Sequence, residues 1–263
     1  MTVEQALRTS SIDPREARLL LAAATGFSEA SVLAYPERCL SPETESRFRE
    51  YVERRQKNEP VAYILGRKEF YGIELTVNPA VLIPRPETEL LVELALQREF
   101  SSVVDLGTGS GAIALAIKRH RPKARVLAVE ASAAALVVAK RNAARLGLDI
   151  EFMHGQWFGP LAGQRLDLIV SNPPYVAHGD PHLADLRFEP AEALVSAPDG
   201  LSALREISGH ANSHLNPGGW LLLEHGIGQE IEVRAHLERG GLEELATWPD
   251  LAGIPRVTGG KVK

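Results

Sequence analysis

The stretch SVVDLGTGSG at residues 102–111, followed by AIALAIKRH at 112–120, decides the fold of this chain. An apolar run of strand length leads into a glycine-rich loop and then into a segment with helical periodicity. The pattern recurs downstream. Further strands are predicted at ARVLAVE (124–130), IEFMHG (150–155), LDLIVS (166–171), GGWLLLEHG (218–226), LEELATW (242–248) and IPRVTGGK (254–261), and the clearest further helix at ASAAALVVAKRNAARLG (131–147). Strands that alternate with helices predict an α/β fold, here a Rossmann-like, doubly wound parallel sheet of seven strands.

The chain before this region has a different pattern, with helix signals first and strand signals after them. Helix starts are indicated at Asp13-Pro14 and Ser41-Pro42, because Asp or Ser caps a helix and Pro is tolerated in its first turn, and Gly26 is a helix stop. EFYGIELTV (69–77) reads as a strand, and a turn at Asn78-Pro79 followed by AVLIP (80–84) suggests a hairpin. We therefore expect a helical N-terminal domain at 1–58, a β-hairpin linker at 59–86 and the α/β domain at 87–263.

Composition narrows the functional classes. The 263 residues are 44% hydrophobic and carry a formal net charge of −5, without the basic excess that phosphate-binding proteins usually show. Cys39 is the only cysteine, which excludes an intrachain disulfide and a thiolate metal cluster. The N-terminus lacks a signal-peptide pattern, and the longest apolar runs are too short to cross a bilayer. We expect a cytoplasmic monomer with no membrane association, no metal and no stable nucleic-acid binding.

The glycine loop points to a cofactor. Open parallel sheets bind ligands beyond the carboxyl ends of their strands, and glycines let the backbone approach a ligand closely. With Ala112 the loop also fits the G-x-G-x-x-A dinucleotide fingerprint, with Glu130 near the position of a ribose-binding acid. Asp105, just before the loop, disfavours a pyrophosphate and suits the cationic S-adenosylmethionine. This favours S-adenosylmethionine over a dinucleotide, with a merely structural turn as a third possibility.

The tetrapeptide after the fourth strand, Asn172-Pro173-Pro174-Tyr175, indicates the reaction. Consecutive prolines fix φ and give a rigid turn at the same sheet edge as the glycine loop. The Asn172 side-chain oxygen and the Pro173 carbonyl can accept both N–H bonds of a planar amide or aromatic amine. They would thereby orient its nitrogen and stabilise the positive charge that grows during methyl transfer. Tyr175 can stack on the planar group. An ordinary proline-rich turn is the alternative.

At these residues the sequence resembles the class I S-adenosylmethionine-dependent methyltransferases. More narrowly, it resembles the release factor glutamine methyltransferases, the PrmC/HemK family. The resemblance spans nearly the whole chain and rests on EPVAYILGRKEFYG, VLIPRPETELLVE, DLGTGSGAIALA, SNPPYV, FEPAEAL followed by DGL, and DLAGIPRVTGGK. It implies a helical N-terminal domain that binds release factors. It also implies methylation of the side-chain nitrogen of the glutamine in the Gly-Gly-Gln loop of class-1 release factors.

The resemblance also implies site residues. Cofactor contacts fall on Gly107, Thr108, Gly109, Ser110, Gly111, Glu130, Trp157 and Asn172; substrate contacts fall on Asn172, Pro173, Pro174 and Tyr175. Arg85 and Glu87 either line the pocket or form a salt bridge at the hairpin end. Two positions depart from the family: Glu130 stands where Asp is usual, and Gln156 replaces an Asp before Trp157, which offers adenine a neutral acceptor.

Several alternatives stay open at this stage. His210 and His214 lie four residues apart on a predicted helix, yet without a third ligand they are better explained as surface side chains. The loop containing His178, Asp180 and His182 either contacts substrate or is simply solvated. The competing enzyme is an N6-adenine methyltransferase acting on DNA or RNA, which would have to flip a base and grip phosphates. A non-catalytic cofactor-binding module is a further class.

Overall fold

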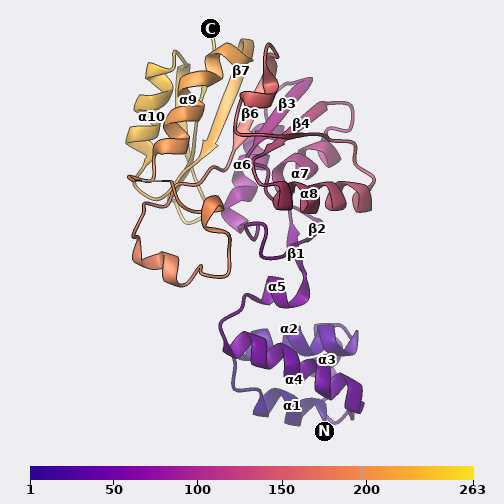
Figure 1. The fold of residues 1–263 in the computed structure, drawn as a ribbon. Helices are drawn as coiled ribbons and strands as arrows, with labels where there is room; N and C mark the ends of the chain where they lie inside the picture. The colour runs from indigo at the N-terminus through magenta and orange to yellow at the C-terminus, as the bar shows by residue number, and fades with distance from the viewer. Residues whose placement is uncertain (197) are drawn as a thin grey trace. The chain divides into compact units, whose positions relative to one another are not determined.

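The computed structural model describes residues 1–196 and 198–263, which form two compact units, Met1–Arg67 and Lys68–Lys263 (Figure 1). The first unit is helical, with α1 (Val3–Thr9), α2 (Pro14–Thr25), α3 (Glu29–Ala34), α4 (Pro42–Gln56) and α5 (Val61–Leu65). Its core is apolar and includes Leu20, Leu21 and Phe48.

The predicted helix boundaries in this unit are confirmed. The Asp13 carboxylate accepts hydrogen bonds from the first N–H groups of α2, and Gly26 ends that helix with φ 75°. The Ser41 hydroxyl caps α4 by accepting from the Thr44 N–H group. Caps of this kind satisfy backbone groups that the helix itself leaves unpaired.

A β-hairpin follows, formed by β1 (Arg67–Phe70) and β2 (Ile73–Thr76). The hairpin turn lies at Tyr71 and Gly72, with φ 48° and 72°. The predicted turn at Asn78-Pro79 also forms, because the Val81 N–H group donates to the Asn78 carbonyl at 3.1 Å, but it does not join the two strands of the hairpin. Two consecutive residues with positive φ match a tight two-residue hairpin turn, so EFYGIELTV contains the end of β1, the turn and all of β2. The segment 78–84 forms neither strand of the hairpin and belongs to the second unit, Lys68–Lys263, called the catalytic unit below because it contains the candidate active site.

The catalytic unit contains a seven-stranded sheet of order β5-β4-β3-β6-β7-β9-β8. Its strands are β3 (Ser102–Leu106), β4 (Arg125–Glu130), β5 (Glu151–His154), β6 (Leu166–Ser171), β7 (Leu215–Glu224), β8 (Glu243–Pro249) and β9 (Pro255–Lys261). All seven predicted strands form. The expectation of an entirely parallel sheet is wrong at one edge, because β9 runs antiparallel to both β7 and β8. Only a short turn joins β8 to β9, and a parallel pair would need a long crossover.

Helices cover both faces of this sheet (Figure 1). One face packs against α6 (Glu89–Leu96), α7 (Ala112–His120) and α8 (Ala133–Leu146), and the other against α9 (Ser202–His214) and α10 (Glu230–Arg239). Strand residues alternate between the two cores: Val103 faces the first and Val104 the second. Short 3-10 turns complete the unit at η1 (Pro86–Thr88), η2 (Gly159–Leu161), η3 (Pro181–Ala184) and η4 (Ala191–Ala193).

Within residues 1–196 and 198–263, no helix combines the length and the apolar character that crossing a bilayer requires.

Candidate active site

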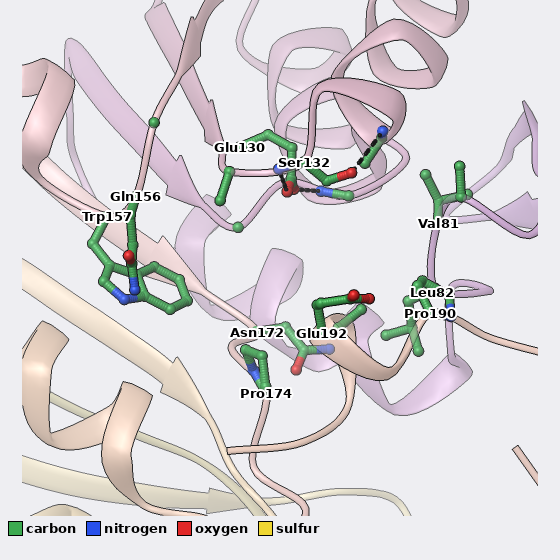
Figure 2. A pocket seen from close by; sticks show the side chains of 17 residues that line it. Val81, Leu82, Glu130, Ser132, Gln156, Trp157, Asn172, Pro174, Pro190 and Glu192 are labelled. Atoms are coloured by element: carbon green, nitrogen blue, oxygen red, sulfur yellow. Dashed lines mark hydrogen bonds between the residues drawn. The ribbon is translucent and has the colours of Figure 1, made fainter. Parts of the chain in front are cut away.

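The carboxyl ends of β3, β4 and β6 open into a cavity of about 540 Å³. Figure 2 shows the labelled side chains around a central space, with Glu130 and Ser132 facing Asn172, Pro174 and Glu192 across it. The lining comprises Ala80, Val81, Leu82, Gly107, Gly109, Glu130, Ala131, Ser132, Ala135, Gly155, Gln156, Trp157, Asn172, Pro174, Pro190, Glu192 and Ala193. The structure thus brings the glycine loop and the proline-rich turn to one cavity, as expected for strands that end at one sheet edge.

The glycine loop is held by backbone hydrogen bonds to β4 and within the loop. The Gly107 and Thr108 N–H groups both donate to the Val129 carbonyl of β4, and the Gly111 N–H group donates to the Thr108 carbonyl. Gly107 and Gly109 line the cavity, whereas the Thr108 and Ser110 side chains are buried beneath it. Gly107 has φ 76°, and a Cβ there would lie 3.2 Å from the Trp157 ring. Glycine at this position therefore serves both the left-handed backbone and the close approach of the ring.

Asp105 lies behind the loop rather than in the cavity. Its Oδ2 atom accepts hydrogen bonds from the Thr108 hydroxyl at 2.6 Å and from the Ala114 N–H group at 3.3 Å. Burial raises its pKa to about 7 against the effect of these bonds. A direct attraction between this carboxylate and a bound cation is the prediction from the sequence. In the structure its visible contacts fix the loop and the start of α7.

Glu130 faces the cavity and braces the loop from the other side. Its Oε2 atom accepts from the Gly109 N–H group and its Oε1 atom from the Ser132 N–H group, both at 2.8 Å. A pyrophosphate would need such N–H donors for itself and would meet the negative charge of Glu130. The geometry therefore disfavours a dinucleotide. It suits a ligand that carries hydroxyl groups and positive charge.

Trp157 and Gln156 form one wall of the cavity (Figure 2). Trp157 has φ 43°, a backbone conformation that is uncommon for a bulky residue. This conformation places its ring against Gly107. A half-buried ring beside the glycine loop is a suitable surface for a flat heterocycle.

The Asn172 side chain is oriented by a residue from a distant motif. Its Nδ2 atom donates a 3.0 Å hydrogen bond to the hydroxyl of buried Thr88, in the IPRPETE segment. Oδ1 is then the side-chain atom that can accept from a ligand. Pro174 also lines the cavity, whereas Pro173 is buried. The turn is anchored because the Gln229 side chain donates to the Tyr175 carbonyl at 3.0 Å.

Tyr175 does not line the cavity. Its hydroxyl donates to the buried Glu224 carboxylate at 3.3 Å, and burial followed by the charge of Glu224 raises its pKa. Stacking of its ring on a substrate thus remains a prediction. Arg85 also lies outside the lining residues and forms an ion pair with buried Glu189. Of the two alternatives for Arg85, the structure contains the salt bridge.

Comparisons with known proteins agree with this site. Residues 86–196 match the model of the methyltransferase small domain, and residues 2–66 match that of the PrmC N-terminal domain. Over nearly its whole length the chain is similar to proteins named release factor glutamine methyltransferase. Identity is 49% with that of Xylella fastidiosa (97% of this chain, 96% of the relative), 45% with that of Burkholderia pseudomallei (99% and 96%) and 47% with that of Neisseria gonorrhoeae (99% and 98%).

The chain belongs to the release factor glutamine methyltransferase family. The resemblance in the sequence motifs is thereby confirmed.

Solved structures support the fold of the family's catalytic unit. A methyltransferase from Pyrococcus furiosus superposes with a TM-score of 0.56 at 18% identity, covering 80% of this chain and 96% of that one. The Thermus thermophilus 16S rRNA N2 G1207 methyltransferase, solved with AdoMet and guanosine, gives 0.56 at 23% identity, covering 75% and 50%. These likenesses establish a class I methyltransferase fold.

Several cavity residues were not identified by sequence reasoning. Val81 and Leu82 form an apolar wall, yet their segment was interpreted as a hairpin strand. Pro190 and Glu192 belong to FEPAEAL, which was recognised as a family motif without a role. Ser132 lies two residues after Glu130, at the start of the next helix. The signal for most of them was the motif itself, because no periodicity marks a loop residue as part of a cavity.

The histidines that the sequence analysis singled out have ordinary local contacts. His210 and His214 each contact the carbonyl four residues earlier, and the His214 ring stacks on Phe158 with centroids 4.4 Å apart. His182 pairs with Asp180 on an exposed loop. In the part of the chain that the structure describes, no cluster of three or more potential ligand side chains is arranged for a metal ion.

Proposed function

We propose that this chain transfers a methyl group from S-adenosylmethionine to the side-chain N5 of the glutamine in the Gly-Gly-Gln loop of class-1 release factors. Two observations support this. Asn172 presents its amide in a cavity that also contains the glycine loop. Relatives with 45–49% identity over nearly the whole chain are named for release factor glutamine.

The residues present fit the methyl donor. Gly107 and Gly109 allow close approach, Glu130 can accept from two ribose hydroxyls, and the Trp157 ring offers a surface for adenine. When bound, S-adenosylmethionine supplies an electrophilic methyl group on a sulfonium. Gln156 is a neutral acceptor where the family usually has Asp, so we expect weaker hydrogen bonding to an adenine amino group here.

The protein's own contribution is orientation and charge stabilisation. An amide nitrogen is a weak nucleophile because its lone pair is delocalised. Asn172 Oδ1 and the Pro173 carbonyl would accept its two N–H bonds and set its direction of attack. They would also stabilise the positive charge that develops on nitrogen. Holding the reacting atoms in line supplies much of the remaining acceleration, as effective molarities show.

The helical unit is the proposed docking part for the release factor, with the N-terminal domain taken as residues 1–58. Leu33 and Tyr35 on this unit are 58% and 48% exposed, which gives it apolar surface. Replacing both with Ser should raise KM for the release factor and leave cofactor affinity unchanged. We further propose that the enzyme is a cytoplasmic monomer without stable nucleic-acid binding.

The test is a transfer assay with methyl-labelled S-adenosylmethionine. The wild-type protein should label an intact class-1 release factor. It should not label one whose loop glutamine is replaced by Glu, which has no N–H group. Label on DNA or RNA and none on the release factor would instead support adenine methylation. No transfer at all, with the cofactor still bound, would support a non-catalytic binding module.

A further inference from the structure

A buried carboxylate lies directly behind the proline-rich turn. Glu224 ends β7, next to the end of β6, and is 1% exposed. Its Oε1 atom accepts from the Tyr175 hydroxyl at 3.3 Å, and the Thr88 hydroxyl lies near this carboxylate and lowers its pKa. Glu224 is therefore next to Tyr175, in the proline-rich turn, and next to Thr88, which accepts a hydrogen bond from Asn172. It is not among the residues that line the cavity.

The direction of these hydrogen bonds determines what Asn172 can present. A Thr hydroxyl has one proton and two lone pairs. If Thr88 donates its proton to the Glu224 carboxylate, its oxygen is left as an acceptor for Asn172 Nδ2, the bond observed at 3.0 Å. The Asn172 amide is then fixed with Oδ1 available for the substrate.

We infer that Glu224 is a positioning residue: its carboxylate, acting through the Thr88 hydroxyl, holds the Asn172 amide with its oxygen toward the substrate nitrogen. The inference rests on the proposed methyl transfer to a planar amide. Protonated Glu224 is itself a donor, which lets Thr88 turn its proton toward Asn172. Asn172 would then present an NH₂ group to the NH₂ group of the substrate, and neither can accept from the other.

This arrangement makes orientation depend on one proton. Burial raises the pKa of Glu224 to about 7, opposed by the Thr88 and Tyr175 hydroxyls and by Arg256 on β9, and reinforced by Glu87 on η1. His225, the next residue along the chain, has its own partners in Thr258 and the Gly226 carbonyl, and burial lowers its pKa. Wild-type kcat should therefore fall below about pH 7 as one group becomes protonated.

The first test compares Glu224→Gln with wild type in methyl transfer to the release factor. We expect kcat at pH 8 to fall about tenfold, the effect of losing roughly one hydrogen bond. We also expect the acidic limb of the pH profile to disappear, and the dissociation constant for S-adenosylhomocysteine to stay within about twofold, because cofactor contacts are untouched. A variant that keeps both the wild-type kcat and the acidic limb would overturn the inference.

Thr88 provides matched variants that do not depend on the folding of Glu224→Gln. Thr88→Val keeps the shape but removes the hydroxyl and should reproduce the loss of kcat, whereas Thr88→Ser should retain both the rate and the pH profile. The double variant Thr88→Val with Glu224→Gln should be no worse than the poorer single variant, because both break one chain of contacts. Additive losses, or a fully active Thr88→Val, would contradict the chain.

A readout without substrate separates this inference from the proposed function. In wild type, the ¹⁵N and ¹H signals of the Asn172 side-chain amide should shift with pH as Glu224 titrates. In Thr88→Val they should not. If the wild type fails to methylate a release factor, the proposed function fails, yet this titration still tests the coupling. A pH-independent amide signal in wild type overturns it.

Discussion

At the start of β6, Asp167 accepts hydrogen bonds from the N–H groups and hydroxyls of Ser101 and Ser102, and from the Asn216 side chain, all at 2.7–3.0 Å. At the opposite edge of the same sheet, where the strands have their carboxyl ends and the cavity lies, Asp105 and Glu224 are almost fully buried. Each of these two has one carboxylate oxygen that finds no partner among the described residues.

The two edges shift pKa values in opposite directions. For Asp167, burial acts to raise the pKa, but its hydrogen bonds outweigh this and lower it. For Asp105 and Glu224, burial prevails and raises the pKa to about 7. At the first edge, both oxygens of the Asp167 carboxylate accept hydrogen bonds, which favours stability. The second edge keeps incompletely paired charge next to the cavity, a common property of functional sites.

The largest expected effect is on the catalytic edge, from Asn172→Ala. Losing the acceptor that orients the substrate nitrogen should lower kcat by about 10²–10³-fold. The affinity for S-adenosylhomocysteine, measured by calorimetry, should change much less, because Asn172 is one of many lining residues. An equal loss of affinity and of kcat would contradict the orienting role.

The next effect comes from Gly107→Ala. The added Cβ would meet the Trp157 ring at 3.2 Å in a left-handed backbone conformation, so cofactor affinity should fall about tenfold or more. Gly147→Ala is a matched control, because Gly147 has φ 65° and open space around it at the end of α8. It should lower the melting temperature without changing the affinity. Comparable affinity losses in both variants would mean that backbone strain alone explains the result.

Much of the fold and part of the candidate site could be predicted from the sequence. The seven strands, the helix caps at Asp13 and Ser41, and the shared edge of the glycine loop and the proline-rich turn all followed from periodicity and capping chemistry. Such signals are local, so a single sequence displays them directly.

The remainder could not be found because it depends on contacts between distant residues. Thr88 and Asn172 are 84 positions apart, and nothing in either motif alone predicts their hydrogen bond. The position of the hairpin turn depended on Tyr71 adopting positive φ, which its residue type disfavours. Asp105 was assigned to the ligand because the sequence shows proximity to the loop but not burial beneath it.

A smaller effect is expected at the edge that contains Asp167. Asp167→Asn should lower the free energy of unfolding by about 2 kcal/mol at pH 7, because charged acceptors form the stronger hydrogen bonds. The folded-state pKa is lowered, so this stability exists above the unfolded-state value of 3.8 and is lost as the pH falls. Urea titrations should show the difference between the two proteins beginning to narrow only below the unfolded-state pKa of 3.8, with cofactor affinity unchanged. A difference that grows at low pH would contradict this assignment.

The last comparison concerns Asp105→Asn and the slope of stability against pH. The folded-state pKa of Asp105 is raised to about 7, so the folded state holds a proton that the unfolded state releases between about pH 4 and 7. Stability should decline as the pH rises through this window, by at most about 1.4 kcal/mol per pH unit for one proton. Unfolding free energies at several pH values should show a shallower decline in Asp105→Asn. An unchanged slope would mean that Asp105 is ionised throughout.

Mapping the transferred methyl group by mass spectrometry tests the central claim most directly. A class-1 release factor incubated with the wild-type protein and S-adenosylmethionine should gain a single methyl group on the loop glutamine, located by peptide fragmentation on the side-chain amide. With Asn172→Ala this peptide should remain almost unmodified at equal cofactor occupancy. A methyl group on a lysine, on a terminus or on nucleic acid would contradict the account of an acceptor-lined turn that orients a planar amide.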